Sequence, residues 1–110
     1  MSLQVTTQGD VVIIAVDGQL IVGNRQELKQ QVLDRVEAGA RKVVVDFAGA
    51  GYIDSSGLGV LVSLAKRLRE LGGDLRLANL NEDLLTLFEL TKLDSLFRIA
   101  ASRDQAVEGF

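Results

Sequence analysis

Histidine, cysteine, proline and tryptophan are all absent from this chain of 110 residues. Without histidine, a Ser-His-Asp catalytic relay cannot be built, and without histidine or cysteine a zinc site lacks its usual ligands. The absence of cysteine also excludes disulfides, which is typical of an intracellular protein. No Asp-rich loop of the EF-hand kind occurs either. These absences argue against an enzyme, and the sequence predicts no metal and no other cofactor.

Positive charge and stacking side chains are also scarce. The net charge is −3 at pH 7, and the chain contains one tyrosine. A protein that binds nucleic acid directly usually carries a cationic field and aromatic side chains that stack on bases. No apolar run approaches the roughly 18 residues needed to span a bilayer, and the N-terminus has no signal-peptide pattern. We therefore expect a cytoplasmic protein that has no membrane span and does not bind nucleic acid directly.

Five short segments have the patterns of β-strands. β-Branched or alternating apolar residues that are bounded by charged residues or glycine are typical of strands. The segments that fit this description are residues 3–7, 11–16, 42–47, 74–79 and 95–100. The first two lie close enough to form a hairpin with Gly9 in its turn.

Helical patterns separate the later strands. Asn24 followed by Glu27 resembles a capping box, and the apolar stripe behind it continues to Gly39. A second helix is predicted to run to about Leu71, and a third begins after Asn81, which is a typical N-cap residue. Residues 103–110 predict a short frayed helix or a tail. Such alternation after an opening hairpin predicts an α/β domain with a mixed sheet covered by helices.

The second of these helices opens with an unusual stretch, "GYIDSSGLGVLV", at residues 51–62. Asp54, Ser55 or Ser56 could each cap the helix, because Asp and Ser before an apolar run are a common start signal. A glycine-rich turn before a helix can also bind anions through backbone N–H groups. The stretch has neither the lysine of a P-loop nor the three-glycine spacing of a dinucleotide site. It therefore gives only weak support to nucleotide binding.

The apolar residues of this helix raise a second question. Leu58, Val60, Leu61 and Val62 point around much of its first turns, whereas a surface helix needs only one apolar stripe. Two explanations remain open. Either neighbouring segments cover these turns, or an apolar patch beside the serines is left for a partner.

The chain resembles a known family along nearly its whole length. "YIDSSGLGVLVSLAKRLRELGGDLRLANL", followed by "LFELTKLDSLFRI", is similar to the STAS domains of bacterial anti-sigma factor antagonists, and the similarity runs from "VVIIAVDGQL" through Phe97. The string Asp-Ser-Ser-Gly-Leu-Gly is its most specific part. The resemblance implies a single STAS domain over residues 1–110, with a mixed sheet of about five strands and helices packed mainly on one face.

The resemblance also implies a regulatory protein rather than a catalyst. An unphosphorylated antagonist binds an anti-sigma factor, often itself a serine kinase, and so frees the sigma factor for transcription. The kinase phosphorylates the first serine of the motif, which corresponds to Ser55, and a serine phosphatase reverses the reaction. The expected partner-binding residues are those around this serine, together with two positions after the second strand: Gln19, Ile21, Asp54, Ser55, Ser56, Gly57, Leu58 and Val60.

One departure from the family pattern affects the choice of partner. Antagonists typically read Gly-Glu-Leu/Ile-Asp after the second strand, but this chain reads "GQLIVGN", with Gln19 and Ile21 in place of the two acids. An alternative is therefore a STAS interaction module of a signalling scaffold or a transport complex with a different partner. A third possibility is a ligand or nucleotide sensor that uses backbone amides near residues 55–59. The sequence leaves a monomer and a weak dimer both open.

Overall fold

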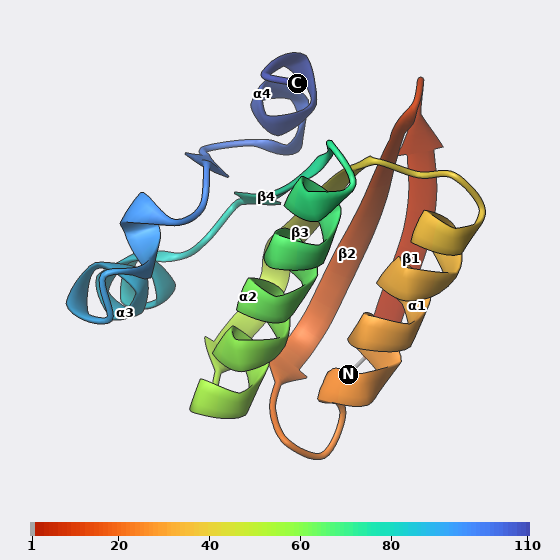
Figure 1. The fold of residues 1–110 in the computed structure, drawn as a ribbon. Helices are drawn as coiled ribbons and strands as arrows, with labels where there is room; N and C mark the ends of the chain where they lie inside the picture. The colour runs from red at the N-terminus through yellow and green to blue at the C-terminus, as the bar shows by residue number, and fades with distance from the viewer. Residues whose placement is uncertain (1) are drawn as a thin grey trace.

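A single five-stranded sheet forms the centre of the molecule (Figure 1). The structure is a computed structural model that describes residues 2–110, so Met1 of the predicted domain lies outside it. The strands are β1 (Ser2–Gln8), β2 (Val11–Leu20), β3 (Lys42–Ile53), β4 (Asp74–Ala78) and β5 (Ile99–Ala100), and they are arranged in chain order. β1 is antiparallel to β2, and the other neighbouring strands are parallel. The sheet is therefore mixed, as the sequence predicts.

Helices cover the two faces of the sheet unequally. They are α1 (Arg25–Glu37), α2 (Ser55–Glu70), α3 (Glu82–Leu90) and α4 (Arg103–Glu108), with a short 3₁₀ turn, η1 (Leu93–Ser95). The buried side chains of α1, α2 and α3 join one large core on one face, and Ala106 of α4 joins a smaller core on the other. Figure 1 shows α1 and α2 side by side in front of the sheet. The prediction of helices mainly on one face is confirmed.

Burial on both faces explains the continuous apolar runs of the central strands. Side chains alternate between the faces of a strand. In β2, Ile14 and Val16 enter the large core, while Val11 and Ile13 enter the small one. A strand covered on both sides needs apolar residues at consecutive positions.

The opening hairpin and the cap of α3 form as predicted. Gly9 lies between β1 and β2 with φ of 63°, a left-handed conformation that glycine adopts at little cost. The Asn81 side chain accepts a hydrogen bond from the backbone N–H of Leu84 at 2.8 Å and closes the first turn of α3. The segment after residue 102 forms a helix, α4, rather than a tail.

The predicted capping box at the start of α1 is wrong. Asn24 is the N-cap residue, but its side chain makes no capping hydrogen bond. Its carbonyl oxygen instead accepts from the backbone N–H of Ile21 at 2.9 Å, and its amide donates to the carbonyl of Gln19 at 3.0 Å. Asparagine readily bonds to nearby backbone in this way, and here it folds the loop before the helix.

The last predicted strand, at residues 95–100, is also too long. Only Ile99 and Ala100 are β-strand, and η1 ends at Ser95. Phe97 is turned into the large core, where its ring meets that of Phe88 edge to face at 5.8 Å. Burial of this aromatic ring outweighs strand pairing over the first half of the segment.

β2 and β3 both extend past their predicted ends. Pairing continues to Gln19–Tyr52 and Leu20–Ile53, although the register shifts on the way. The apolar pattern stops at residues 16 and 47, so it does not reveal this extension. The extension places the segment after β2 beside the start of α2.

Candidate functional site

Asp54 organises the start of α2. Its side chain is the N-cap of the helix: one oxygen, Oδ1, accepts from the backbone N–H of Gly57 at 2.8 Å and from the Ser56 hydroxyl at 2.6 Å. Of the three residues that could have capped the helix, the structure selects Asp54. The hydrogen bonds from Ser56 and Gly57 favour the ionised form and hold the pKa of Asp54 below its usual 3.8. The carboxylate is therefore charged at neutral pH.

The second oxygen of Asp54 holds the loop after β2. Oδ2 accepts from the backbone N–H of Val22 at 3.0 Å, and the N–H of Asp54 donates to the carbonyl of Leu20 at 3.0 Å. Asn24 folds the same loop from its other end. The segment that carries Gln19 and Ile21 is thus fixed next to the serine motif.

The two serines of the motif occupy different environments. Ser55 is exposed at the first residue of α2, whereas Ser56 is half-buried and its hydroxyl is engaged by Asp54. A hydroxyl that must be presented to a second protein's active site has to be accessible. Of the two, Ser55 therefore has the better geometry for modification.

Gly57 has a packing role that the sequence does not reveal. It is buried, and a Cβ at this position would lie 2.7 Å from the carbonyl oxygen of Leu20 and 2.9 Å from a methyl carbon of Ile53. The absence of a side chain lets the first turn of α2 approach the ends of β2 and β3.

Leu58 and Val60 are buried, with 7% and 8% of their surface exposed, and both belong to the large core. Of the two explanations for the apolar first turns, cover by neighbouring elements is correct at these positions. An exposed patch made of Leu58 and Val60 is therefore ruled out. These residues offer a partner little surface, and they support the position of the motif from below.

A comparison with known protein families identifies the domain. A model of the STAS domain matches residues 2–106. The chain belongs to the STAS domain family. It is 32% identical to the candidate anti-sigma factor antagonist BtrV of Bordetella bronchiseptica, over the whole of this chain and 95% of the relative. It is also 32% identical to the anti-sigma-B factor antagonist of Bacillus subtilis, over 86% of each chain.

Solved structures share the fold of this STAS domain. The crystal structure of a candidate anti-sigma factor antagonist from Thermotoga maritima has a TM-score of 0.92 and 29% identity, covering 97% of this chain and 92% of the other. The phosphorylated form of the Bacillus cell fate determinant SpoIIAA, at 19% identity and a TM-score of 0.76, has the same fold. This structural match covers 97% of each chain. Both comparisons extend over nearly the whole domain.

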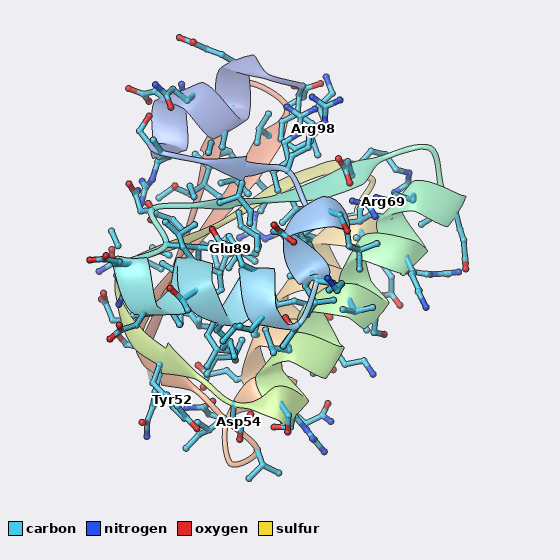
Figure 2. The ribbon with its side chains drawn as sticks, turned by 90° about the vertical axis from the view of Figure 1, so that its left-hand side faces the viewer. Tyr52, Asp54, Arg69, Glu89 and Arg98 are labelled. Carbon is cyan, nitrogen blue, oxygen red and sulfur yellow. The ribbon has the colours of Figure 1, made fainter. Side chains whose placement is uncertain are left out.

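Two exposed apolar residues beside the motif were missed by sequence reasoning. Val22 and Tyr52 have 64% and 54% of their surface exposed. Gln19, which is also exposed, pairs with Tyr52 across β2 and β3, while Ile21 is half-buried. Tyr52 and Asp54 lie together at one end of the molecule in Figure 2. In the sequence Val22 follows Ile21 and Tyr52 precedes Ile53, so nothing in the local pattern marks either residue as exposed.

A groove of about 420 Å³ runs from the motif to α3. Tyr52, Ser55 and Leu58 line one side, and Leu87 and Asp83 of α3 line the other. Two charged residues line the groove, Asp54 and Asp83, and both are acidic. The groove therefore combines apolar walls with an acidic rim beside the Ser55 hydroxyl.

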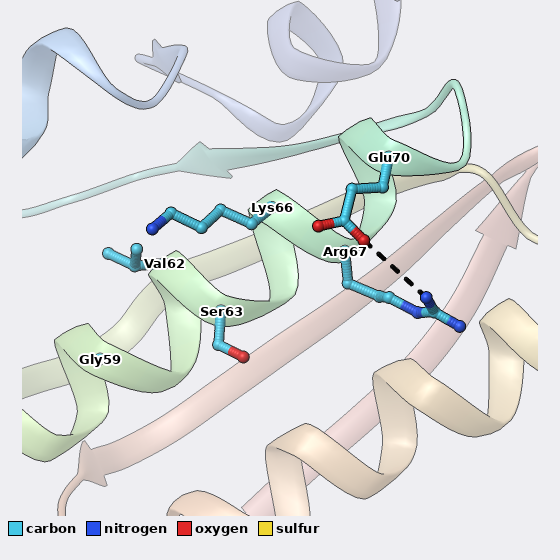
Figure 3. A pocket seen from close by; sticks show the side chains of 6 residues that line it. All are labelled: Gly59, Val62, Ser63, Lys66, Arg67 and Glu70. Carbon is cyan, nitrogen blue, oxygen red and sulfur yellow. Dashed lines mark ion pairs between the residues drawn. The ribbon is translucent and has the colours of Figure 1, made fainter.

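The outer face of α2 continues from the motif as a polar surface. Figure 3 shows Val62 and Lys66 on this face, with Ser63 beside them and Arg67 paired to Glu70 at 3.9 Å. The pair is exposed and contributes little to stability. Ser63 is exposed two turns beyond Ser55, so it is a natural control for any modification of the helix.

Within residues 2–110, no group of three or more carboxylates is placed to hold a metal ion. No helix of that range is long and apolar enough to cross a membrane.

Proposed function

We propose that this STAS domain is an anti-sigma factor antagonist, which binds an anti-sigma factor in its unphosphorylated form and so frees a sigma factor for transcription. The observation that carries this proposal is the exposed Ser55 at the first residue of α2, beside a capping Asp54 whose second oxygen fixes the loop after β2. The names of two relatives at 32% identity, matched over 95% and 86% of their lengths, support it.

Phosphorylation of Ser55 by a serine-kinase anti-sigma factor is the proposed switch, and a serine phosphatase reverses it. A phosphate adds about −1.5 to −2 charge next to the ionised Asp54. The N-terminus of α2 tolerates this charge within the protein, where it contributes on the order of 0.3–1 kcal/mol. A partner surface that rests on Ser55 has to desolvate the phosphate, which can cost several kcal/mol. The interface is thereby blocked without refolding.

The proposed contact surface is centred on the exposed side chains around the motif. Val22 and Tyr52 supply exposed apolar area, and Ser55 lies on the same end of the domain. Gln19 belongs to this surface because it pairs with Tyr52. Leu58, Val60 and Gly57 act through packing that keeps the motif in place, and Asp54 and Ser56 act through the cap.

We further propose that the domain acts in the cytoplasm and has no catalytic activity of its own. A hydrolase built on Ser55 would need a base, and the chain contains no histidine. The partner, in contrast, supplies the kinase chemistry. Regulation thus depends on whether Ser55 in the contact surface is phosphorylated, and not on a reaction catalysed by the domain.

The test is phosphorylation by the serine-kinase anti-sigma factor from the same organism. The purified chain is incubated with the kinase and ATP, and the product is mapped by mass spectrometry. We expect one phosphate, on Ser55, which Ser55→Ala removes and Ser63→Ala retains. An unmodified chain, or a phosphate placed on Ser63 or Ser56, would sink the proposed switch.

A different partner is the second candidate, and one observation favours it. The positions where antagonists usually carry acids hold an exposed amide, Gln19, and a half-buried apolar side chain, Ile21. Binding of the purified kinase to the wild type and to Gln19→Glu distinguishes the two. Tighter binding by Gln19→Glu means that this surface is adapted to a partner of other charge, such as a scaffold or transport subunit.

A further inference from the structure

A second cavity lies on the other face of the sheet, away from the serine motif. It has a volume of about 320 Å³, is open to solvent, and is bordered by β4, β5 and α4. Its polar lining side chains are Arg76, Arg98 and Gln105. All three can donate hydrogen bonds, and two of them are positively charged.

Arg76 is buried without adequate partners. The residue is only 9% exposed, and its Nε atom has no hydrogen-bond partner. The nearest carboxylate oxygen, Oδ2 of Asp74, lies 3.8 Å from Nε, and the other oxygen of Asp74 already accepts from Arg69 at 2.9 Å. One further bond, from Nη1 to the carbonyl of Ala106, is long at 3.5 Å. A buried charge so weakly compensated is costly to the fold.

The end of the chain holds this guanidinium in place. The ring of Phe110 stacks on it, with the Arg76 carbon Cζ 4.0 Å from the ring centre. A Cβ at Gly109 would collide with Nη1 of Arg76, so the glycine provides the room that the side chain occupies. With one face covered by Phe110, the guanidinium can still donate hydrogen bonds from its edge.

Arg98 adds a second positive charge beside the first. Leu77 pairs with Ile99 in parallel register, and the N–H of Leu77 donates to the carbonyl of Arg98 at 3.0 Å. Arg98 therefore neighbours Arg76 across the two strands, on the same face. Like charges placed this way are destabilising. Within residues 2–110, no carboxylate lies within ion-pair distance of Arg98, although α4 carries Asp104 and Glu108.

We infer that this cavity binds a small oxyanion, a phosphate or a carboxylate, between Arg76, Arg98 and Gln105. Two adjacent guanidinium groups present paired N–H donors, which match the oxygen atoms of such an anion. An anion here supplies countercharge beyond the distant Asp74 and joins the sheet to α4. A cation is disfavoured by the two arginines, and an apolar ligand would accept no hydrogen bond from either of them.

The site is separate from the proposed phosphorylation switch. In β4 the side chains of Leu75 and Leu77 enter the large core under α2, and Arg76 points to the opposite face. Figure 2 shows Arg98 near α4 and Asp54 at the other end of the molecule. Anion binding therefore does not require Ser55, and failure of one proposal leaves the other intact.

Inorganic phosphate is the first probe. The full chain is titrated at constant ionic strength, with sodium chloride as the balancing salt, and backbone amide shifts are followed by NMR. We expect saturable shifts confined to Arg76, residues 98–100 and residues 105–109, and a rise in melting temperature that chloride alone does not cause. Acetate in a parallel titration distinguishes carboxylate from phosphate recognition.

Two matched variants complete the experiment. Arg98→Gln should weaken phosphate binding about tenfold or more, because a charged hydrogen-bond pair is lost. Arg67→Gln removes the same charge from the outer face of α2 and should bind like the wild type. Without anion, Arg98→Gln should melt at the same or a higher temperature, because the repulsion of Arg76 is relieved. Shifts that do not saturate, or equal binding by Arg98→Gln and the wild type, would overturn the inference.

Discussion

The backbone N–H of Val22 donates a hydrogen bond of 3.0 Å to the carboxylate of Asp54, which lies 32 residues later in the chain. The other oxygen of the same carboxylate caps α2 through Gly57 and Ser56. One side chain therefore sets the position of an exposed apolar loop relative to the start of the helix. This arrangement is what places Val22 and Ser55 on one prepared surface.

Removal of the Ser56 hydroxyl should raise the pKa of Asp54 toward its usual 3.8. The hydrogen bond from Ser56 is the largest influence that lowers this pKa, and Ser56→Ala deletes it. NMR titration of the Asp54 carboxyl carbon measures the change, with Ser63→Ala as the control. A group whose pKa is lowered by folding stabilises the fold above its usual pKa, and this stability is lost as the pH falls through the folded value. The acid-dependent loss should therefore be smaller in Ser56→Ala, and an unchanged Asp54 pKa would contradict the cap geometry.

Two glycines in the first turns of α2 should respond to alanine in opposite ways. Gly57→Ala forces a Cβ against the Leu20 carbonyl and Ile53, which we expect to cost about 1–3 kcal/mol of unfolding free energy. At Gly59 nothing lies within 4 Å of a Cβ, so Gly59→Ala should gain about 0.5–1 kcal/mol through helix propensity. Denaturant unfolding of both variants measures the difference. Equal stability of the two would mean that α2 does not approach the sheet closely at Gly57.

The architecture could be predicted from the sequence because burial leaves a periodic pattern. The strands and helices that pack against the core carry that pattern, and Asn81 carries a recognisable cap. The errors fall where other forces decide. Asn24 bonds to the loop instead of the helix, and Phe97 gives up strand pairing for the core. Both outcomes depend on contacts made in the folded chain, so the local sequence pattern does not reveal them.

The candidate site was predictable in its chemistry but not in its surface. The string from Asp54 to Leu58 identifies the helix start and the serine, because caps and family motifs are local. Which apolar residues remain exposed depends on what covers them. Leu58 is buried by neighbouring elements, whereas Val22 and Tyr52 are not, and this distinction exists only in the folded chain.

Asp46 should be the most sensitive acidic residue in the domain. Its side chain is 5% exposed and accepts hydrogen bonds of 2.9 Å from Asn79, from the N–H of Ala48 and from Arg103. These bonds link β3 to the residue after β4 and to α4. Asp46→Ala leaves these donors unpaired and should cost about 3 kcal/mol. Asp10→Ala, which breaks an exposed pair with Lys42, should change stability little. Chemical denaturation compares the unfolding free energies of the two variants. Equal losses would contradict the linking role of the Asp46 hydrogen bonds.

The contribution of Asp46 should also depend on pH in a defined direction. Burial opposes its ionisation, but the hydrogen bonds from Asn79, Ala48 and Arg103 prevail and hold its pKa below 3.8. The stability that it provides is therefore present above that value and lost as the pH falls through the folded pKa. The gap in melting temperature between the wild type and Asp46→Asn should be constant near neutral pH and shrink in strong acid. If the difference in melting temperature widened on acidification, the pKa of Asp46 would be raised by folding and not lowered.

Exposed apolar side chains beside the motif should contribute to partner binding without supporting the fold. Val22→Ser and Tyr52→Ser remove apolar area that is already in water, so the melting temperature should change little. Affinity for the anti-sigma factor, measured by calorimetry, should fall about tenfold or more if these residues are central to the interface. Thr6→Ser, on the exposed face of β1 and paired with Ile13, is the control. Unchanged affinity in both apolar variants would move the interface away from this end of the domain.

Ser55→Asp tests whether the proposed switch acts by blocking a surface. Ser55 is exposed at the positive end of the α2 dipole, so an added carboxylate should leave the melting temperature unchanged or slightly higher. The same charge should weaken binding of the anti-sigma factor, because binding removes water from the new carboxylate while it lies beside the like-charged Asp54. Ser55→Asn, which is similar in size and uncharged, separates charge from bulk. Calorimetric binding and thermal melting are measured on all three proteins. Loss of folding in Ser55→Asp would refute a blocked interface, and equal affinities of Ser55→Asp and the wild type would show that charge at this position does not control the partner.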